Sequence, residues 1–220
     1  MDKIVTIDGP AGSGKSTVSR LVAKRLNFLY LDTGAMYRGV ALQARRMGID
    51  LSDGKELWRL CEHLDLNFKT DGDHTRLYVG EEDISSAIRT PEMDMLSSSV
   101  SAIEEVRTAM TGLQRKMGKR GGLVAEGRDM GTVVFPDADH KFFLTASPEI
   151  RAERRYQERV DRGESVSKKE VEAELKKRDN QDKTRSIAPL VPAEDAKVID
   201  STRLNPEQVV EEILNDIKNR

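Results

Sequence analysis

The sequence predicts an α/β fold: a doubly wound, five-stranded parallel sheet flanked by helices, with a small antiparallel β insert and a helical lid. Three observations lead to this prediction. Short apolar runs alternate with amphipathic helical patterns along most of the chain, which is typical of a parallel sheet. A glycine-rich loop joins the first apolar run to the first helix. Residues 66–84 change instead to short alternating runs. The length of 220 residues fits one domain, 1–220.

The first third of the chain contains two apolar runs and three helical patterns. We expect strands at 4–7 and 28–31 and helices at 15–26, 35–47 and 54–64. Gly48 should end the second of these helices, because glycine readily adopts the left-handed conformation of a C-cap.

The β insert covers residues 66–84. Asp71-Gly72 is a turn signal between two short runs, and Gly80 marks a second turn. The pattern predicts two or three short antiparallel strands attached to the main body.

The remainder of the chain returns to helices and buried strands. Helices should start near Pro91 and at a capping box formed by Ser101 and Glu104. Further on, Ser147 should cap a helix that reaches about 160, and a second capping box, Ser167 with Glu170, should start the next one. The remaining elements are strands at 123–125, 141–144 and 197–199, a helix that ends near 183, and a terminal helix that starts at Pro206.

Composition excludes several classes of protein. Lysine and arginine total 36 against 38 acidic residues, which gives a net charge of -2 and argues against a nucleic-acid partner. The single cysteine, Cys61, cannot form an internal disulfide, and only three histidines argue against a zinc site. No run approaches the roughly 18 apolar residues of a membrane helix. We therefore expect a cytoplasmic enzyme or switch that does not bind membranes.

The glycine-rich loop fits the pattern G-x-x-x-x-G-K-[ST] of a phosphate-binding loop, or P-loop. Its glycines let successive backbone N–H groups point at phosphate oxygens, and the following helix N-terminus adds positive potential. Lys15 would bind the β and γ phosphates as a catalytic residue, and Ser16 would offer its hydroxyl to Mg²⁺. The expected ATP-binding residues are Gly9, Pro10, Ala11, Gly12, Ser13, Gly14, Lys15, Ser16 and Thr17.

A regulatory GTPase is the non-enzymatic alternative for such a loop. Proteins of that class usually carry D-x-x-G and N-K-x-D further along the chain. No glycine here has an aspartate three residues earlier, and no asparagine precedes a lysine. The sequence therefore argues against a GTPase.

Two segments at strand ends are candidates for binding a phosphoryl acceptor. Thr33 could cap the helix after the second strand, and Arg38 lies one turn further on. After the third strand, Glu126 could bind a metal through water, and Arg128 is followed by Asp129. The structural alternatives are a capped helix with a surface arginine and a surface ion pair.

The segment 149–185 is rich in both arginine and acidic residues, so most of its charges fit a solvated helical hairpin. Arg151, Arg154 and Arg155 differ because their spacing puts them on one helix face. Three like charges repel unless an anion lies among them, so we expect at least one to contact a triphosphate.

The chain resembles the bacterial-type cytidylate kinases over essentially its whole length. The matching segments are IDGPAGSGKST, LDTGAMYR, IRT, AEGRDMGTVVFPDA, RDNQDKTR, APLVPA and VIDST. The insert at 66–84 matches the extra sheet of that family's monophosphate-binding region. Two positions vary among relatives: Thr33 is often serine, and Glu126 is often aspartate.

The resemblance implies the reaction ATP + CMP or dCMP → ADP + CDP or dCDP with Mg²⁺, in the recycling of cytidine nucleotides. It implies a monomer with a monophosphate-binding region at 33–108 and a lid at 149–185. Thr33, Arg38 and Arg128 would bind the acceptor phosphate, and Asp32 would also belong to the CMP site. Ser98, Arg107 and Asp129 would read the cytosine, and Arg178, Asp182 and Arg185 would face the sugar. Without the resemblance, Ser98 and Arg107 would be interpreted as exposed helix positions.

Two other interpretations of the function remain open. A P-loop kinase for a non-nucleotide metabolite, such as a small hydroxy acid, would not need the insert or the pair Ser98 and Arg107. A nucleotide-binding regulator without catalysis would not consume ATP in the presence of CMP.

Overall fold

The computed structural model describes residues 3–71 and 74–219. The chain forms two compact units. The first consists of Met1–Leu29 and Gly121–Arg220, and the second is Tyr30–Arg120. The second unit contains all of the region 33–108, and the first contains all of the region 149–185.

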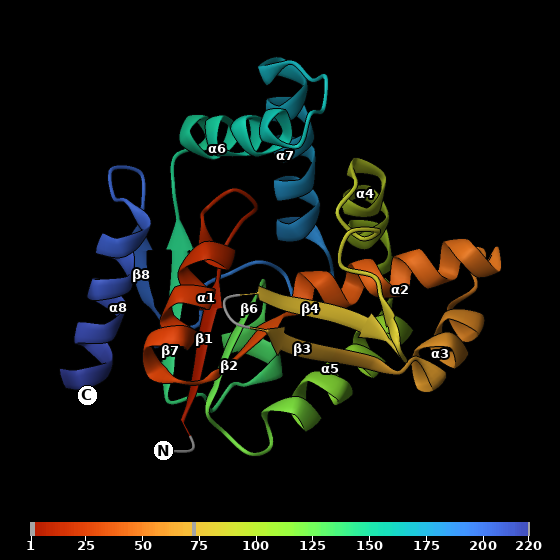
Figure 1. Cartoon of the computed structure of the whole chain (residues 1–220), viewed down its shortest axis with the longest axis horizontal. Coiled ribbons are helices and arrows are strands. Elements are labelled where there is room, and N and C mark those ends of the chain that lie inside the picture. Colours follow the sequence, from red (N-terminus) through yellow and green to blue (C-terminus); the bar gives the residue numbers. More distant parts are fainter. Residues whose placement is uncertain (1–2, 72–73, 220) are drawn as a thin grey trace. The chain divides into compact units, whose positions relative to one another are not determined.

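The five-stranded sheet confirms the predicted fold class. Its order is β2-β6-β1-β7-β8, and β1 lies between β6 and β7 with both pairings parallel (Figure 1). β8 pairs in parallel with β7. The strands are β1 (Ile4–Asp8), β2 (Leu29–Asp32), β6 (Leu123–Gly127), β7 (His140–Thr145) and β8 (Lys197–Asp200). Because the paired strands are parallel, the polar segments that follow β1, β6, β7 and β8 lie at one edge of the sheet.

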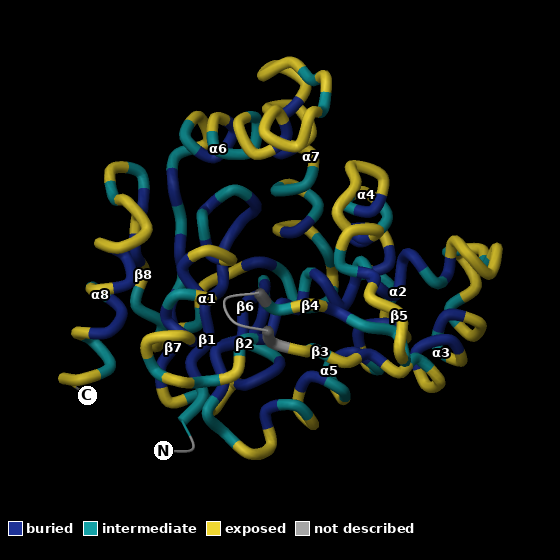
Figure 2. The backbone as a smooth tube through the Cα atoms, in the orientation of Figure 1, coloured by how far each residue is buried: buried dark blue, intermediate teal, exposed yellow. Residues whose placement is uncertain are grey.

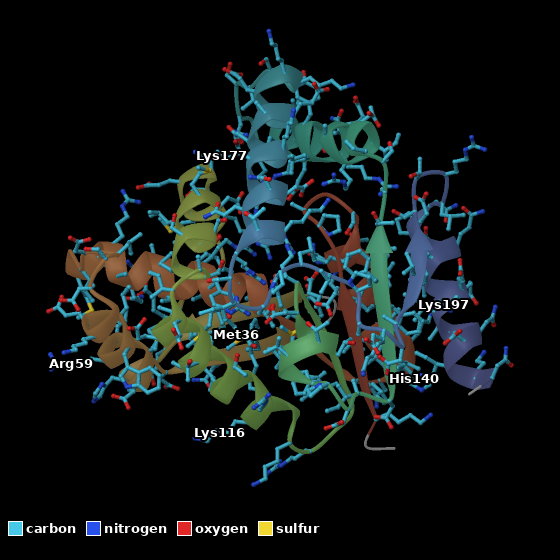
Figure 3. All side chains as sticks on the ribbon, turned by 180° about the vertical axis from the view of Figure 1, so that it is seen from behind. Met36, Arg59, Lys116, His140, Lys177 and Lys197 are labelled. Atoms are coloured by element: carbon cyan, nitrogen blue, oxygen red, sulfur yellow. The ribbon has the colours of Figure 1, made fainter. Side chains whose placement is uncertain are left out.

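Helices of the first unit connect these strands. They are α1 (Lys15–Leu26), the π-helix η1 (Met130–Val134), α6 (Pro148–Asp161), α7 (Lys168–Thr184) and α8 (Pro206–Asn219). α1 packs against β6 and α8, and β1 and β6 are almost wholly buried (Figure 2). Lys197 of β8, labelled in Figure 3, forms ion pairs with Glu212 and Asp216 of α8. α6 and α7 form a separate helical pair that follows β7 (Figure 1).

The second unit combines four helices with the β insert. Its elements are α2 (Thr33–Met47), α3 (Gly54–His63), β3 (Leu66–Asp71), β4 (His74–Val79), β5 (Glu82–Asp83), α4 (Pro91–Val100) and α5 (Glu104–Gly118). The strands form the predicted antiparallel sheet, in the order β3-β4-β5. A Cβ on Gly39 of α2 would lie 3.2 Å from Leu66 and 3.4 Å from Leu77, so the insert packs closely on this helix. Gly72 of the predicted Asp71-Gly72 turn lies outside the described residues.

Two predicted helix caps are wrong. Thr33 is the first residue of α2, and the cap is Asp32, whose Oδ1 accepts a hydrogen bond from Ala35 N at 2.8 Å. A capping side chain belongs to the residue just before the helix, because from there its oxygen reaches the backbone N–H three residues further on. In α2 this residue is Asp32. Ser101 does not start α5: it ends α4, and its hydroxyl donates to Ser98 O. α5 starts after Ile103 without a side-chain cap.

The other predicted helix ends are confirmed. Gly48 ends α2 with a φ of 67°. Ser147 caps α6, and Ser167 with Glu170 forms the predicted capping box of α7. These motifs depend only on residues close in sequence, which is why they can be predicted locally. In the described part of the chain, no helix is long and apolar enough to cross a membrane.

Candidate active site

The P-loop occupies the turn between β1 and α1. Gly9, Gly12 and Gly14 all have positive φ values. A Cβ on Gly9 would lie 2.0 Å from Leu144 O, and one on Gly12 would lie 2.7 Å from Arg151 O. Neither position has room for a side chain, because both contacts are with backbone atoms. The loop therefore needs glycine for close packing as well as for its backbone conformation.

Lys15 is buried at the start of α1, and its ammonium donates to Pro10 O at 3.0 Å. Burial lowers the pKa of Lys15 to about 7, and the charge of Arg128 acts in the same direction. The carboxylates of Glu126 and Asp182 act against this shift. An anion beside Lys15 would therefore be expected to raise its pKa again.

Ser16 and Glu126 lie together, as expected for a metal site. The Ser16 hydroxyl donates to Glu126 Oε2 at 2.9 Å, and Glu126 is buried at the end of β6. These are two oxygen groups of the kind that Mg²⁺ prefers. No cluster of three or more histidine, cysteine or acidic residues that could hold a metal occurs among the described residues. Mg²⁺ bound beside substrate phosphates commonly takes only one or two protein ligands and completes its coordination with phosphate and water.

The arginines predicted to bind the acceptor in the first unit lie around Asp182. Arg128 Nε donates to Asp182 Oδ2 at 2.8 Å. Asp182 is buried, which acts to raise its pKa, but the charges of Arg128 and Arg178 hold that pKa below its usual value. The carboxylate is therefore ionised at neutral pH and keeps two arginines beside it.

Asp129 and Arg185 complete this group. Arg185 Nη2 lies 3.7 Å from Asp129 Oδ1, and its Nε donates to Ala188 O at 2.6 Å. Ala188 has a φ of 50°, a left-handed conformation that alanine seldom adopts. The structure thus brings together all five residues predicted for the acceptor in this unit: Arg128, Asp129, Arg178, Asp182 and Arg185.

The second unit carries another cluster of charges at the start of α2. Arg38 lies 3.6 Å from Asp32 and 3.6 Å from Asp94, and Arg89 lies 3.7 Å from Asp32. The Nε of Arg38 is buried and has no hydrogen-bond partner in the described part of the chain. Thr33 is buried at the start of the same helix. A guanidinium with an unused donor beside a helix N-terminus is a suitable place for an anion.

Ser98 and Arg107 are both buried, at 7% and 4% exposure, so their interpretation as exposed helix positions is wrong. Arg107 donates to Ser101 O at 2.9 Å and lies 5.8 Å from the ring centre of Tyr37. Ser101 in turn donates to Ser98 O. A buried arginine beside a tyrosine ring is costly to maintain for stability alone, and it is a suitable reader of a planar polar ligand.

The three arginines of α6 that were predicted to contact a triphosphate differ from one another. Arg151 is buried, donates to Ala11 O at 3.1 Å and forms an ion pair with Asp179 at 2.7 Å. Arg155 pairs with Glu158 at 2.7 Å. Carboxylates of the protein therefore neutralise both of these charges, so repulsion on this helix face does not by itself require an anionic ligand. Arg154 forms no ion pair with a carboxylate in the described part of the chain, and it donates to Ser13 O and to Ser201.

Asp179 and Ser201 were not predicted as site residues, although both contact arginines of α6. The signal was present, since Asp179 lies in the segment RDNQDKTR and Ser201 in VIDST. Asp8, whose side chain bonds to the backbone after β6, was also missed.

Comparison with known proteins identifies the family of this chain. The family model described as cytidylate kinase matches residues 5–219. A cytidylate kinase of Geobacter sp. (strain M21) is 52% identical over 99% of this chain and 93% of its own length. A cytidylate kinase of Citrifermentans bemidjiense is 51% identical with the same coverage.

Solved structures support the fold. The crystal structure of a gluconokinase from Sinorhizobium meliloti 1021 matches with a TM-score of 0.52 at 14% identity, covering 99% of this chain and 93% of that one. At 14% sequence identity, this match shows only that the two proteins share a fold. The match of the family model over residues 5–219, together with identities above half, decides the family: the chain belongs to the cytidylate kinases, a family of nucleoside monophosphate phosphotransferases.

Proposed function

We propose that the enzyme transfers the γ-phosphoryl group of ATP to CMP or dCMP, with Mg²⁺, and so recycles cytidine nucleotides. The observation that carries this proposal is the cluster of Arg128, Arg178 and Asp182 beside the P-loop lysine, Lys15, in a member of this family. We also expect a cytoplasmic monomer that binds neither nucleic acid nor membranes.

Catalysis would depend on alignment and on neutralisation of charge. The attacking atom of CMP is already an anionic phosphate oxygen, so no strong base is needed. Lys15 would bind the phosphates of ATP, and Arg128 would bind the acceptor phosphate while Asp182 fixes its guanidinium. Charge on the transferred group would thus be balanced by side chains that are already in place.

Mg²⁺ would be held by the Ser16 hydroxyl and, through water, by Glu126. When bound, it neutralises phosphate charge and polarises the phosphoryl group. Ser16 Oγ lies 2.9 Å from Glu126 Oε2, so a metal ion bound to the Ser16 hydroxyl would lie close to the Glu126 carboxylate.

For CMP we propose the ligands that the family resemblance implies. Thr33, Arg38 and Arg128 would bind the phosphate, with Asp32 fixing the start of α2. The other proposed ligands are Ser98, Arg107 and Asp129 for the base, and Arg178, Asp182 and Arg185 for the sugar. Of the lid arginines, Arg154 is the one we propose for ATP, because it donates to Ser13 O of the P-loop and pairs with no carboxylate among the described residues.

The test of this function is an acceptor screen. ADP release is measured by a coupled assay with Mg-ATP and CMP, dCMP, UMP, AMP, GMP or shikimate. We expect CMP and dCMP to be the preferred acceptors. Preference for shikimate or another hydroxy acid would support the metabolite-kinase alternative, and no release with any acceptor would support a non-catalytic regulator.

Nucleotide binding should take up protons near neutral pH. The pKa of Lys15 is about 7 in the free protein, so the amine is partly neutral between pH 7 and 8. The phosphates of ATP raise this pKa, and on the order of half a proton should be taken up at pH 7. Binding should therefore weaken as the pH rises above 7.

Calorimetry of ATP binding in buffers with different ionisation enthalpies measures this uptake. Lys15→Arg is the matched control, because arginine stays protonated over this range and should show no uptake. A buffer-independent enthalpy for the wild type, or equal uptake in both proteins, would contradict the assignment of the titration to Lys15.

The lid at 149–185 should become more protected when substrates bind. Its apolar cluster is small: Ala152, Val171 and Leu175 pack on Ala11 of the P-loop, with only the partly buried Tyr156 and Val166 beside them. With so little buried surface, local opening should be frequent in the free enzyme. Hydrogen exchange over about 149–182 should slow with a bisubstrate analogue, whereas α8 serves as the internal control and should not change. Equal protection of the lid with and without ligand would contradict closure.

A further inference from the structure

The π-helix η1 begins directly after Asp129 and has no local cap. Asp129 occupies the N-cap position, but its side chain makes no capping hydrogen bond. The first N–H groups of a helical turn have no partner within it, and leaving them unbonded in the interior is costly. Met130 and Gly131 are buried, so their N–H groups need acceptors from elsewhere in the protein.

Asp8 supplies both acceptors from another strand. Its Oδ1 accepts from Met130 N at 2.9 Å, and its Oδ2 accepts from Gly131 N at 2.8 Å. Asp8 is the last residue of β1 and is 5% exposed. Burial raises its pKa to about 7, while the two N–H groups act to lower it. A carboxylate is suited to this position because both of its oxygens accept.

The backbone of Asp129 is part of the turn that Asp8 caps. Asp129 O accepts from Val133 N at 2.9 Å and from Val134 N at 3.1 Å. The turn also fits closely against β1, since a Cβ on Gly131 would lie 3.0 Å from Thr6 Oγ1 and 3.5 Å from Asp8 Oδ2. A displacement of η1 from Asp8 would therefore move Asp129, and with it the neighbouring Arg128. One-turn π-helices are rare and occur often at functional sites.

We infer that Asp8 is a positioning residue for the phosphoryl acceptor: it caps η1 from β1, and so fixes Arg128 and Asp129 while leaving the Asp129 side chain to face the acceptor base. The inference rests on the proposed function, in which Asp129 reads the cytosine. Asp8 also directly precedes Gly9 of the P-loop, but its two side-chain hydrogen bonds go to the turn after β6 and not to the loop.

Asp8→Asn tests this role with little change in shape. The amide keeps one acceptor, but its NH₂ group faces the second backbone N–H, so one of the two hydrogen bonds is lost. We expect the KM for CMP to rise about tenfold and the preference for CMP over UMP to fall by a similar factor. The KM for ATP should stay within about twofold, although Asp8 is adjacent to the P-loop.

Thr6→Val is the matched control. Thr6 lies two residues earlier on β1, is fully buried and is near Gly131, but its hydroxyl has no hydrogen-bond partner among the described residues. It should leave both KM values and the base preference unchanged. Gly131→Ala is a second test that keeps Asp8: its φ is outside the left-handed region, and its Cβ would press the turn away from β1. We expect the same selective rise in the KM for CMP.

Hydrogen exchange of the Met130 and Gly131 amides gives a readout that does not depend on the reaction. Exchange should become faster in Asp8→Asn and stay unchanged in Thr6→Val. If folded Asp8→Asn and Gly131→Ala both keep the wild-type KM for CMP, or change the KM values of CMP and ATP equally, the positioning role is overturned. Failure of the proposed function is seen separately, as a wild-type enzyme that does not phosphorylate CMP.

Discussion

Lys15→Ala should lower the turnover of CMP phosphorylation by on the order of 10²-fold or more, a loss typical of removed charge stabilisation. The ammonium lies at the P-loop and donates to Pro10 O, so it is already placed for the phosphates of ATP. Alanine removes a charge that would interact with the transferred phosphoryl group more strongly in the transition state than before it. The effect should therefore fall mainly on kcat.

The fold should tolerate this change. Lys15 is held in the interior at a pKa of about 7, so its charged form is not favoured there in the absence of ligand. Removing a buried, incompletely paired amine should cost little stability. Arg20→Ala, an exposed position on the same helix, is the control and should keep normal kcat. A folded Lys15→Ala protein with near-normal turnover would contradict the P-loop assignment.

Most of the fold could be predicted because it depends on local patterns. The P-loop, the capping box of Ser167 with Glu170 and the alternation in the β insert each involve residues close in sequence. The Thr33 prediction failed for a local reason as well: Asp32 and Thr33 are both good caps, and only the observed backbone decides between them.

The contacts that were missed join residues far apart in the chain. Asp8 caps η1 across more than a hundred residues, and Arg151 finds its counter-charge on α7. No spacing rule predicts such a pairing, because it depends on how strands and helices pack. The burial of Ser98 and Arg107 follows from no local pattern, since polar residues on a helix are usually exposed unless a tertiary contact covers them; only the family resemblance marked these two positions.

Substitution of Asp129 or Arg107 should change base preference more than any other property. Cytosine presents an amino donor at position 4 and an acceptor at N3, and uracil reverses both. Asp129 would accept from the amino group of cytosine and repel the uracil oxygen, and Arg107 would donate to cytosine N3. With uracil, both of these hydrogen-bond contacts would be mismatched. Each buried mismatch costs about 1–3 kcal/mol of binding free energy, so the two together give a roughly 10–10⁴-fold preference for CMP over UMP. Both side chains are at most 4% exposed, so bulk water does not weaken these contacts.

Asp129→Asn keeps the shape of the side chain and adds a donor, so it should reduce kcat/KM for CMP more than for UMP. Arg107→Met keeps much of the length beside Tyr37 but loses the donor, and it should reduce discrimination in the same direction. The measurement is kcat/KM for both acceptors at saturating Mg-ATP, with melting temperatures to check folding. Asp129 also lies 3.7 Å from Arg185, so a purely electrostatic effect would weaken both acceptors equally and leave their ratio unchanged. If both variants keep the wild-type ratio, these side chains do not read the base, even in an enzyme that prefers CMP.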